Sequence, residues 1–403
     1  MKTKYLFLSL VAGLMVCFTS CQNDDLEIQP QVLANGEITR SVSSNHRILV
    51  LSEGNMTDEN GTLAEIILGD RYLQVRDSVY QKCNGGLKLG NVAQDLYIRD
   101  SIMYIICQNG HVQGGDSSLI AVNARTYRKI YSIGRGFGTS YGSSPTHLAV
   151  VNHQKAYVRC DNGLKIANLQ EPNRGLQPEV LVANAAKTKL AVVSGKVYAA
   201  KDSSVAEINP SNDAVSDIAI NQGAIASIVK GFGNTLWVFS IQNSTTGVLT
   251  KLNTGTRNQI HYTIKCSKRD LDNNLFIPSV GLCCRANEAL DTLYFRGNGW
   301  EPQYVYRVLP TNTTQPINAE VYYTANLAEH NVGMIYGDLG VDPQTGYVYF
   351  GYVKNFGSYK TNGIIELRGK EIVGLNYNNK ELGTKIDTRF TAGIYFPELF
   401  GSN

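Results

Sequence analysis

The sequence predicts an all-β protein built from one structural unit that repeats along most of the chain. Short apolar strands alternate with polar turns from residue 46 onward, and no ten-residue stretch between 46 and 400 has a convincing helical period. Glycine (38 residues) and tyrosine (23 residues) are plentiful, whereas charged residues make up only 18% of the chain. Many turns and half-buried aromatic strands give such a composition.

An aromatic residue inside an apolar strand marks each repeat. These residues are Tyr104, Tyr157, Tyr198, Trp237, Tyr294 and Tyr349. They are spaced by about 39 to 57 residues, a range that suits the blades of a β-propeller. A seventh apolar strand at 47–51 has no inner strand before it, and residues 390–396 supply one. The sequence therefore predicts a seven-bladed β-propeller closed by pairing of the C-terminal strand with the N-terminal blade. Six or eight blades are the main alternatives, and a β-sandwich fits the repeat less well.

The first twenty residues have the pattern of a signal peptide. Lys2 and Lys4 precede an apolar segment at 6–18, and small residues lead to Cys21. This pattern predicts a lipoprotein whose acylated Cys21 is its sole membrane anchor. The alternative is an ordinary secretory signal followed by a chance cysteine. The predicted organisation is a lipoprotein signal peptide at 1–20, a lipidated cysteine and flexible tether at 21–45, and the propeller at 46–403.

Charge and cysteine spacing argue against several kinds of partner. The formal charge of +3 falls to +1 when Lys2 and Lys4 are removed, which leaves no basic stripe for nucleic acid. The six histidines form no H-E-x-x-H motif or close pair, and the cysteine spacings match no zinc site, so no metal or cofactor is predicted. Export permits disulfides, but we expect mostly buried free thiols at Cys83, Cys107, Cys160, Cys266, Cys283 and Cys284.

A binding face is predicted where the loops after the second strands meet the segments that lead into the inner strands. Amides, aromatic rings and mixed charges at these positions suit a polar organic ligand. The alternative is a solvated rim, which every propeller has. The predicted ligand-binding residues are Gln94, Asp95, Gln108, Asn109, His147, Arg159, Asp161, Lys201, Asp202, Asn298, Trp300, Tyr352, Lys354 and Arg389. Glu53, Lys189 and Asp338 belong to the same predicted face.

Catalytic signatures are weak in this sequence. Gly138-x-Ser140-x-Gly142 has the spacing of a nucleophile elbow, but that motif requires a strand before the serine and a helix after it. A binding loop fits this glycine-rich segment better. Carboxylates are scattered, and no acid–base pair stands out. We therefore expect a binding protein with no catalytic residues.

Two short motifs carry a resemblance to a known family. Leu51-Ser52-Glu53-Gly54-Asn55 resembles the opening of the YncE-like surface-layer β-propeller lipoproteins of Bacteroidota. Leu89-Gly90-Asn91-Val92-Ala93-Gln94 resembles the link into their second blade. With the tyrosine-bearing repeats, the resemblance covers nearly all of 46–400. Ser52 stands where this family usually has Asn.

The resemblance implies a function and a location. Members of the cobalamin-capturing branch bind the vitamin and pass it to a TonB-dependent outer-membrane transporter. The resemblance therefore implies a protein that captures a corrinoid on its loop-rich face. Gln22-Asn23-Asp24-Asp25 resembles the acidic tag of Bacteroidota lipoproteins, which implies a place on the outer membrane facing the cell exterior. One alternative is a structural or adhesive surface propeller that binds a protein or glycan. Another is a propeller lyase or hydrolase, which would need converging histidine and carboxylate side chains.

Overall fold

The architecture is taken from a computed structural model. It describes residues 27–28, 46–68, 73–112, 114–137, 144–170, 175–243, 246–266, 280–284, 291–296, 303–310, 316–325, 332–369, 371–373 and 388–400. The predicted signal peptide and Cys21 lie outside these residues. Almost all regular structure in the described part is β-strand, which confirms the all-β prediction. The helical elements there are α1 (Val79–Cys83) and the 3-10 helix η2 (Pro397–Phe400), and no described helix has the length and apolarity of a membrane span.

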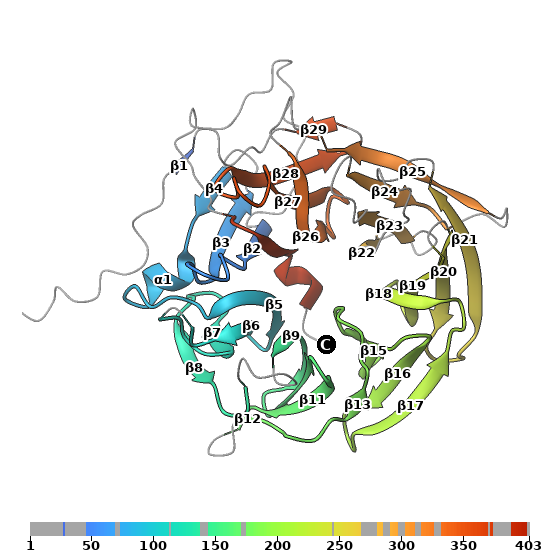
Figure 1. The fold of residues 1–403 in the computed structure, drawn as a ribbon, viewed down its shortest axis with the longest axis horizontal. Coiled ribbons are helices and arrows are strands. Elements are labelled where there is room, and N and C mark those ends of the chain that lie inside the picture. Colours follow the sequence, from blue (N-terminus) through green and yellow to red (C-terminus); the bar gives the residue numbers. More distant parts are fainter. Residues whose placement is uncertain are drawn as a thin grey trace, which may run out of the picture.

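The strands form antiparallel groups that stand around a common axis (Figure 1). The first group runs outward as β30 (Thr391–Tyr395), β2 (His46–Ser52), β3 (Thr62–Leu68), β4 (Leu73–Arg76) and β1 (Glu27–Ile28). The second contains β5 (Asn91–Arg99), β6 (Ile102–Gly110), β7 (Leu119–Asn123) and β8 (Lys129–Ile133). The third contains β9 (Pro145–Asn152), β10 (Lys155–Cys160) and β11 (Gly163–Asn168), with β12 (Gly175–Leu176) and β13 (Val182–Ala183) both paired to β11.

The remaining groups continue around the axis (Figure 1). The fourth contains β14 (Ala191–Val193), β15 (Lys196–Ala200), β16 (Ser204–Asn209) and β17 (Ala214–Ala219). Next come β18 (Ala224–Lys230), β19 (Thr235–Asn243), β20 (Thr246–Asn253) and β21 (Gln259–Cys266). These are followed by β22 (Val280–Cys284), β23 (Asp291–Arg296), β24 (Tyr304–Val308) and β25 (Ile317–Thr324). Parallel pairing of β21 with β25 joins these two groups into one eight-stranded sheet. The last group contains β26 (Met334–Val341), β27 (Val348–Val353), β28 (Asn362–Arg368) and β29 (Glu371–Val373).

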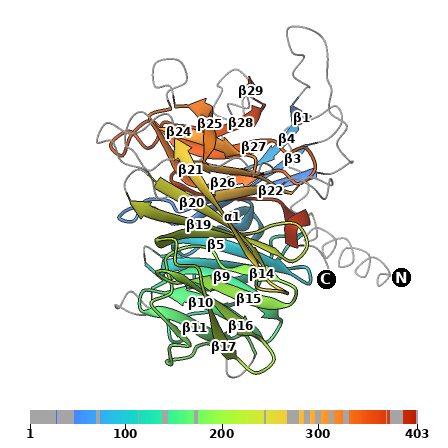
Figure 2. The same ribbon diagram turned by 90° about the vertical axis from the view of Figure 1, so that its right-hand side faces the viewer.

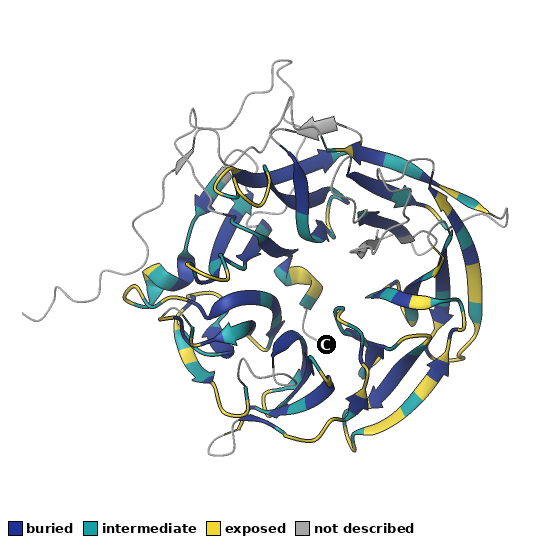
Figure 3. Ribbon diagram, in the orientation of Figure 1, coloured by how far each residue is buried: buried dark blue, intermediate teal, exposed yellow. Residues whose placement is uncertain are grey.

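The core lies between neighbouring sheets and is built on the aromatic repeat residues. Tyr104, Tyr157, Tyr198, Trp237, Tyr294 and Tyr349 are each at most 1% exposed. Each lies on the second strand of its group, where both faces of the sheet are covered; Tyr104, for example, packs with Leu148 and Val158 of the next sheet. Outermost strands such as β17 carry the exposed positions (Figure 3). Sheets that are apolar on both faces are stable only when they are stacked, which explains the circular arrangement.

A repeated asparagine turn links the third and fourth strands of several groups. The side-chain oxygens of Asn123, Asn209 and Asn253 accept backbone N–H groups two residues further on. The residue four positions after each asparagine is left-handed, and these residues are Tyr127, Asp213 and Arg257. Their side chains all reach the preceding sheet. The contacts are Arg47–Tyr127 at 2.5 Å, Lys155–Asp213 at 2.8 Å and Glu207–Arg257 at 3.2 Å.

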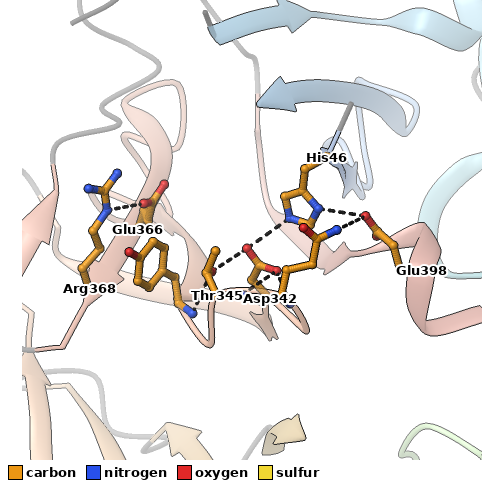
Figure 4. A network of polar contacts seen from close by, with 8 residues as sticks. His46, Asp342, Thr345, Glu366, Arg368 and Glu398 are labelled. Carbon is orange, nitrogen blue, oxygen red and sulfur yellow. Dashed lines mark hydrogen bonds and ion pairs between the residues drawn. The ribbon is translucent and has the colours of Figure 1, made fainter. Parts of the chain in front are cut away.

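The two ends of the described propeller are joined by β-pairing and by a buried histidine. β30 pairs with β2, so that Val50 faces Ile394. At the start of β2, His46 Nδ1 lies 2.8 Å from Glu398 Oε1 of η2, and its Nε2 lies 3.0 Å from Asp342 Oδ2, just after β26 (Figure 4). We call His46, Asp342 and Glu398 the latch.

Charge pairing in the latch outweighs the cost of burial. Burial would lower the pKa of His46, but its bonds to Asp342 and Glu398 raise it to about 9. Burial would likewise raise the pKa of Asp342, but His46 and Thr345 hold it below its usual value. The latch is therefore a charged cluster at neutral pH.

The cysteines whose side chains are described are free thiols. Cys107, Cys160 and Cys266 are buried, and Cys83 is partly buried. Cys283 and Cys284 are successive residues of β22.

Candidate functional site

Several inner strands carry a β-bulge close to the end at which they begin. Register shifts of this kind occur in β5, β9, β18, β26 and β30. A bulge adds a residue to one strand and re-aims the side chains around it, and bulges are frequent beside functional sites. In β5 and β9 the shifts precede Asp95 and His147, and in β26 the shift contains Asp338. The bulges thus occur where ionisable residues sit on the innermost strands.

Asp95 is a buried carboxylate held by three sheets. Its Oδ1 accepts a hydrogen bond from the Tyr395 hydroxyl at 2.9 Å. Its Oδ2 accepts one from the Leu148 backbone N–H at 3.3 Å and lies 3.4 Å from His147 Nδ1. Burial alone would raise the pKa of Asp95, but Lys189, His147 and Tyr395 together hold it below its usual value. Asp95 is therefore ionised at neutral pH.

Lys189 connects Asp95 with a second carboxylate, Asp338. Its Nζ lies 3.6 Å from Asp95 Oδ1 and 3.2 Å from Asp338 Oδ2, and it sits 4.2 Å from the centre of the Tyr395 ring. Lys189 leads into β14 and Asp338 belongs to β26, and these sheets are not neighbours in the ring (Figure 1). Burial would lower the pKa of Lys189, but Tyr395, Asp338 and Asp95 raise it above its usual value. Lys189 is therefore an ammonium ion and not a nucleophile.

Arg296 reaches the same region from the end of β23. Its Nε donates a hydrogen bond of 2.8 Å to the Gly337 carbonyl. Burial lowers the pKa of Arg296, while Asp338 and Tyr336 oppose this shift; the guanidinium stays charged. Gly337 is left-handed, with φ of +72°, and a Cβ there would lie 1.8 Å from the Thr391 carbonyl oxygen. Only glycine fits this bulge, which presents the acceptor of Arg296.

Glu53, just after β2, is a partly exposed carboxyl with a perturbed pKa. The Tyr336 hydroxyl donates a hydrogen bond of 3.2 Å to its Oε2. Burial raises the pKa of Glu53 to about 7, although hydrogen bonds with Tyr336 and Gln94 and the charge of Lys187 oppose the shift. Glu53 therefore exchanges a proton near neutral pH.

These groups surround one end of a cavity on the axis. The cavity has a volume of about 1070 Å³. Its charged end, as we call it, is lined by Asp95, His147, Lys187, Lys189, Arg296 and Asp338. The rest of its lining includes charged residues, such as Arg99, Lys230 and Glu398, and the apolar side chains of Tyr97, Phe232, Leu399 and Phe400. The last two belong to η2, the short red helical turn on one face of the ring (Figure 2). The cavity lining thus combines charged and apolar side chains, and six ionisable residues gather at the charged end.

The charged end can hold polar ligands through both donors and acceptors. The residues whose positions the structure describes contain no group of three or more His, Cys, Asp or Glu side chains placed to hold a metal ion. The approach of Asp95 to His147 is the kind of contact that orients an imidazole for proton transfer. A binding role requires only the arrangement of charges already described.

The structure brings together some of the predicted site residues. Asp95 and His147 meet in the charged end, as do Lys189 and Asp338 from the same predicted face. Gln94 lies beside Glu53. All of these except Glu53 lie on the inner strands or lead into them. The inner strands converge on the axis, whereas the loops after the second strands start further out. Residues on the inner strands therefore meet more readily than residues in those loops.

Other predicted residues have local partners. Arg159 is buried and donates to the Ala185 carbonyl at 3.3 Å. Lys201 pairs with Asp217 of the outermost strand β17 at 2.7 Å. Tyr352 belongs to β27 and is 4% exposed, instead of standing on an open loop. The other placements are Gln108 and Asn109 in β6, Asp161 after β10, Asp202 after β15, Lys354 after β27, and Arg389, which pairs with Glu59, before β30. Asn298 and Trp300 lie outside the described residues.

Sequence reasoning missed four residues near the charged end. These are Lys187, Arg296, Tyr336 and Tyr395. Arg296 had a usable signal, because it follows the apolar segment Leu293-Tyr294-Phe295 directly and so ends a second strand with a cation. Tyr336 and Tyr395 had none, because each resembles the tyrosines of the core.

The motifs that carry the family resemblance have mainly structural roles. Gly54 is left-handed, and a Cβ there would lie 2.3 Å from the Asn60 carbonyl oxygen. The Asn91 amide donates to the Glu59 carbonyl at 3.0 Å and accepts from Asn109 at 2.8 Å. Glu53 is the exception, because it is linked to Tyr336 beside the charged end.

Residues 47–400 match the family model described as a domain of unknown function, DUF5074. The chain belongs to the DUF5074 family. No curated protein matches the sequence.

Solved structures support the propeller character of this DUF5074 chain. A Bacteroides uniformis protein proposed to be a 6-phosphogluconolactonase is 11% identical, with a TM-score of 0.56 over 88% of this chain and 100% of that one. A quinonprotein alcohol dehydrogenase-like protein from Bacteroides thetaiotaomicron is 13% identical, with a TM-score of 0.51 over 93% and 94%. The extracellular domain of a proposed one-component system from B. thetaiotaomicron is 12% identical, with a TM-score of 0.50 over 76% of this chain; this chain spans 36% of its length. Such low identities show the fold alone.

Proposed function

We propose that this DUF5074 chain is a cell-surface lipoprotein that binds a small polar molecule at the charged end of its axial cavity. The observation that carries the proposal is the cavity itself, about 1070 Å³ in volume and lined at one end by six ionisable side chains from five strand groups. A concave site with converging polar groups is the usual form of a small-molecule site. A ring of stacked sheets fixes these groups in advance, which lowers the entropic cost of binding.

The proposed scaffold is a closed ring of seven blades. Seven antiparallel groups can be counted from the pairings, if the eight-stranded sheet is divided at β21 and β25. The pairing of β30 with β2 and the latch support closure between the first and last groups. In this arrangement the inner strands β5, β9, β14, β18, β26 and β30 contribute residues to the cavity lining.

The proposed ligand is a corrinoid, delivered to a TonB-dependent transporter in the outer membrane. Support comes from the motifs at 51–55 and 89–94, which resemble those of the YncE-like propellers and their cobalamin-capturing branch. The anchor is proposed to be lipid on Cys21, facing the cell exterior. A Cys21→Ala variant should then fail to incorporate radiolabelled palmitate in cells. Equal labelling of the variant and the parent protein would contradict the anchor.

Calorimetric titration with cyanocobalamin tests the ligand. We expect saturable binding of cyanocobalamin at micromolar concentrations. Asp338→Asn should bind at least tenfold more weakly, because Asp338 holds the Lys189 ammonium in place at the charged end. Arg128→Gln, which changes an exposed turn residue away from the cavity, serves as the control and should bind like the parent protein. Absence of heat and of any spectral shift would exclude a corrinoid, and a rim that binds a protein or glycan would then become the better proposal.

One observation favours a second candidate, a propeller lyase or hydrolase. His147 lies 3.4 Å from Asp95 at the charged end, which is the convergence of imidazole and carboxylate that such an enzyme requires. Turnover of an ester or lactone that is lost in His147→Gln and kept in Arg128→Gln would support it. Equal background rates in all three proteins would exclude hydrolysis of the substrates tested.

A further inference from the structure

The cations of the charged end outnumber its anions. Lys187, Lys189 and Arg296 contribute three positive charges, and Asp95 and Asp338 contribute two negative charges, which leaves a net charge of +1 when His147 is neutral. Both carboxylates are already engaged by one ammonium group, because Lys189 lies 3.6 Å from Asp95 and 3.2 Å from Asp338. Lys187 and Arg296 make no ion pair within the described part of the chain, and the surplus is largest while the neighbouring Glu53 is protonated.

Arg296 retains most of its hydrogen-bonding capacity. A guanidinium has five N–H donors, and the bond from Nε to the Gly337 carbonyl uses one of them. Within the described part of the chain, the other four make no hydrogen bond and the group makes no ion pair. Arg296 is only partly buried and lines the cavity, so these donors are open to a ligand. The two terminal nitrogens form the planar fork that matches a carboxylate or a phosphate.

Lys187 supplies the second cation. It is exposed, it lines the cavity, and its side chain has neither a hydrogen bond nor an ion pair with any residue that the structure describes. Its charge acts on Glu53, which is bonded to Tyr336, the residue that precedes the acceptor of Arg296. Lys187 and Arg296 thus border the same polar region from different strand groups.

We propose that Arg296 and Lys187 form a subsite for an anionic group, so that the ligand of the cavity is an organic carboxylate or phosphate. This inference rests on the proposed binding function of the cavity and specifies the charge of the ligand. The acidic group pairs with the Arg296 fork and the Lys187 ammonium. The rest of the ligand extends along the axis toward the apolar side chains of Phe232 and Leu399.

The test uses simple anions instead of a corrinoid. Binding of inorganic phosphate to the purified protein is followed by phosphorus NMR line broadening, and acetate is measured as a competitor. We expect saturable phosphate binding that Arg296→Gln weakens at least about tenfold, because charge-assisted bonds are lost. Lys187→Gln should weaken it about threefold, because a single exposed charge contributes less. Arg128→Gln removes the same charge from an exposed turn and should bind phosphate like the parent protein.

The outcomes separate this inference from the corrinoid proposal. Equal phosphate affinity in the parent protein, Arg296→Gln and Lys187→Gln would overturn the subsite, and so would the absence of saturable binding. If Arg296→Gln does not fold, Lys187→Gln decides the question, because its side chain is exposed. A protein that binds phosphate through these residues but gives no heat with cyanocobalamin would retain the anion subsite and lose the corrinoid. Stronger competition by acetate than by added phosphate would identify the preferred anion as a carboxylate.

Discussion

The latch and the charged end are two clusters of charge in the same ring, and they differ in what their charges face. In the latch, the two ring nitrogens of His46 each face a carboxylate, and Asp342 also accepts bonds from the turn that follows it, including the Thr345 hydroxyl at 2.6 Å (Figure 4). Of the three latch residues, Glu398 lines the axial cavity and His46 and Asp342 do not. The latch is an internally paired cluster that joins distant segments.

The charged end joins distant segments too, but its pairing is incomplete. Lys189 spans the axis between two carboxylates, while Arg296 keeps donors that no described residue accepts. The comparison shows that burial of charge does not by itself indicate a binding site, since ion pairs also serve structure. Surplus donors that border a cavity are the feature that separates the two clusters.

The largest effect should follow from breaking the latch. Asp342→Ala removes a carboxylate that bonds both to His46 and to Thr345 in the following turn. The buried His46 imidazolium is then left with one carboxylate partner instead of two. Loss of one partner of a buried pair costs about 3 to 5 kcal/mol of unfolding free energy. Urea unfolding measures this loss, and ligand affinity below the transition should be unchanged. A variant as stable as the parent protein would show that the latch is not needed to join the ends.

Gly337→Ala should disturb the charged end instead. The new methyl group would collide with the Thr391 carbonyl, and the alanine would have to adopt a left-handed φ. Strain and overpacking together predict a loss of about 2 to 4 kcal/mol, and a displaced carbonyl would also weaken ligand binding through Arg296. Gly195→Ala is the matched control, because Gly195 has φ of +75° with nothing within 4 Å of the added carbon, and it should cost about 1 kcal/mol. Equal losses in the two variants would rule out the close contact as the cause.

The sequence determined the core of this protein more fully than its site. The aromatic repeat residues, with Tyr104 and Trp237 among them, could be identified because a strand buried on both faces requires an apolar run around a large side chain. The pairing of residues 390–396 with 47–51 could also be anticipated, because an unpaired inner position must be filled. These features depend on composition and on spacing along the chain.

The charged end depends on how far each side chain lies from the axis, which spacing does not reveal. Lys201 and Lys189 look alike in sequence, but Lys201 pairs with an outermost strand and Lys189 spans the axis. The bulge at Gly337 is likewise hidden, because it arises from the close approach of β30, more than fifty residues away in sequence. Register shifts of one or two residues decide which side chains enter the cavity.

The latch should also give a pH dependence of its own. The pKa of His46 in the folded protein, about 9, lies above its ordinary value of 6.5. The folded state therefore binds this proton more tightly, so its stabilisation is complete below about pH 6.5 and is lost as the pH rises through 9. The loss should reach at most about 3 kcal/mol. Unfolding of the parent protein and of His46→Gln between pH 6 and 10 measures it, and parallel curves would contradict the assignment.

Glu53 should produce a smaller slope at lower pH, beside the charged end. Its pKa is raised by burial from an ordinary value of 4.5 to about 7, so between these values the unfolded chain has released a proton that the folded protein retains. Stability should therefore fall as the pH rises from about 4.5 to 7 and level off above it. Because the side chain is partly exposed, we expect about 2 kcal/mol. In Glu53→Gln the unfolding free energy should no longer change between pH 4.5 and 7. Its decrease between pH 6.5 and 9, which comes from His46, should remain. If this upper decrease disappears instead, the two clusters are coupled, and the separation between the latch and the charged end fails.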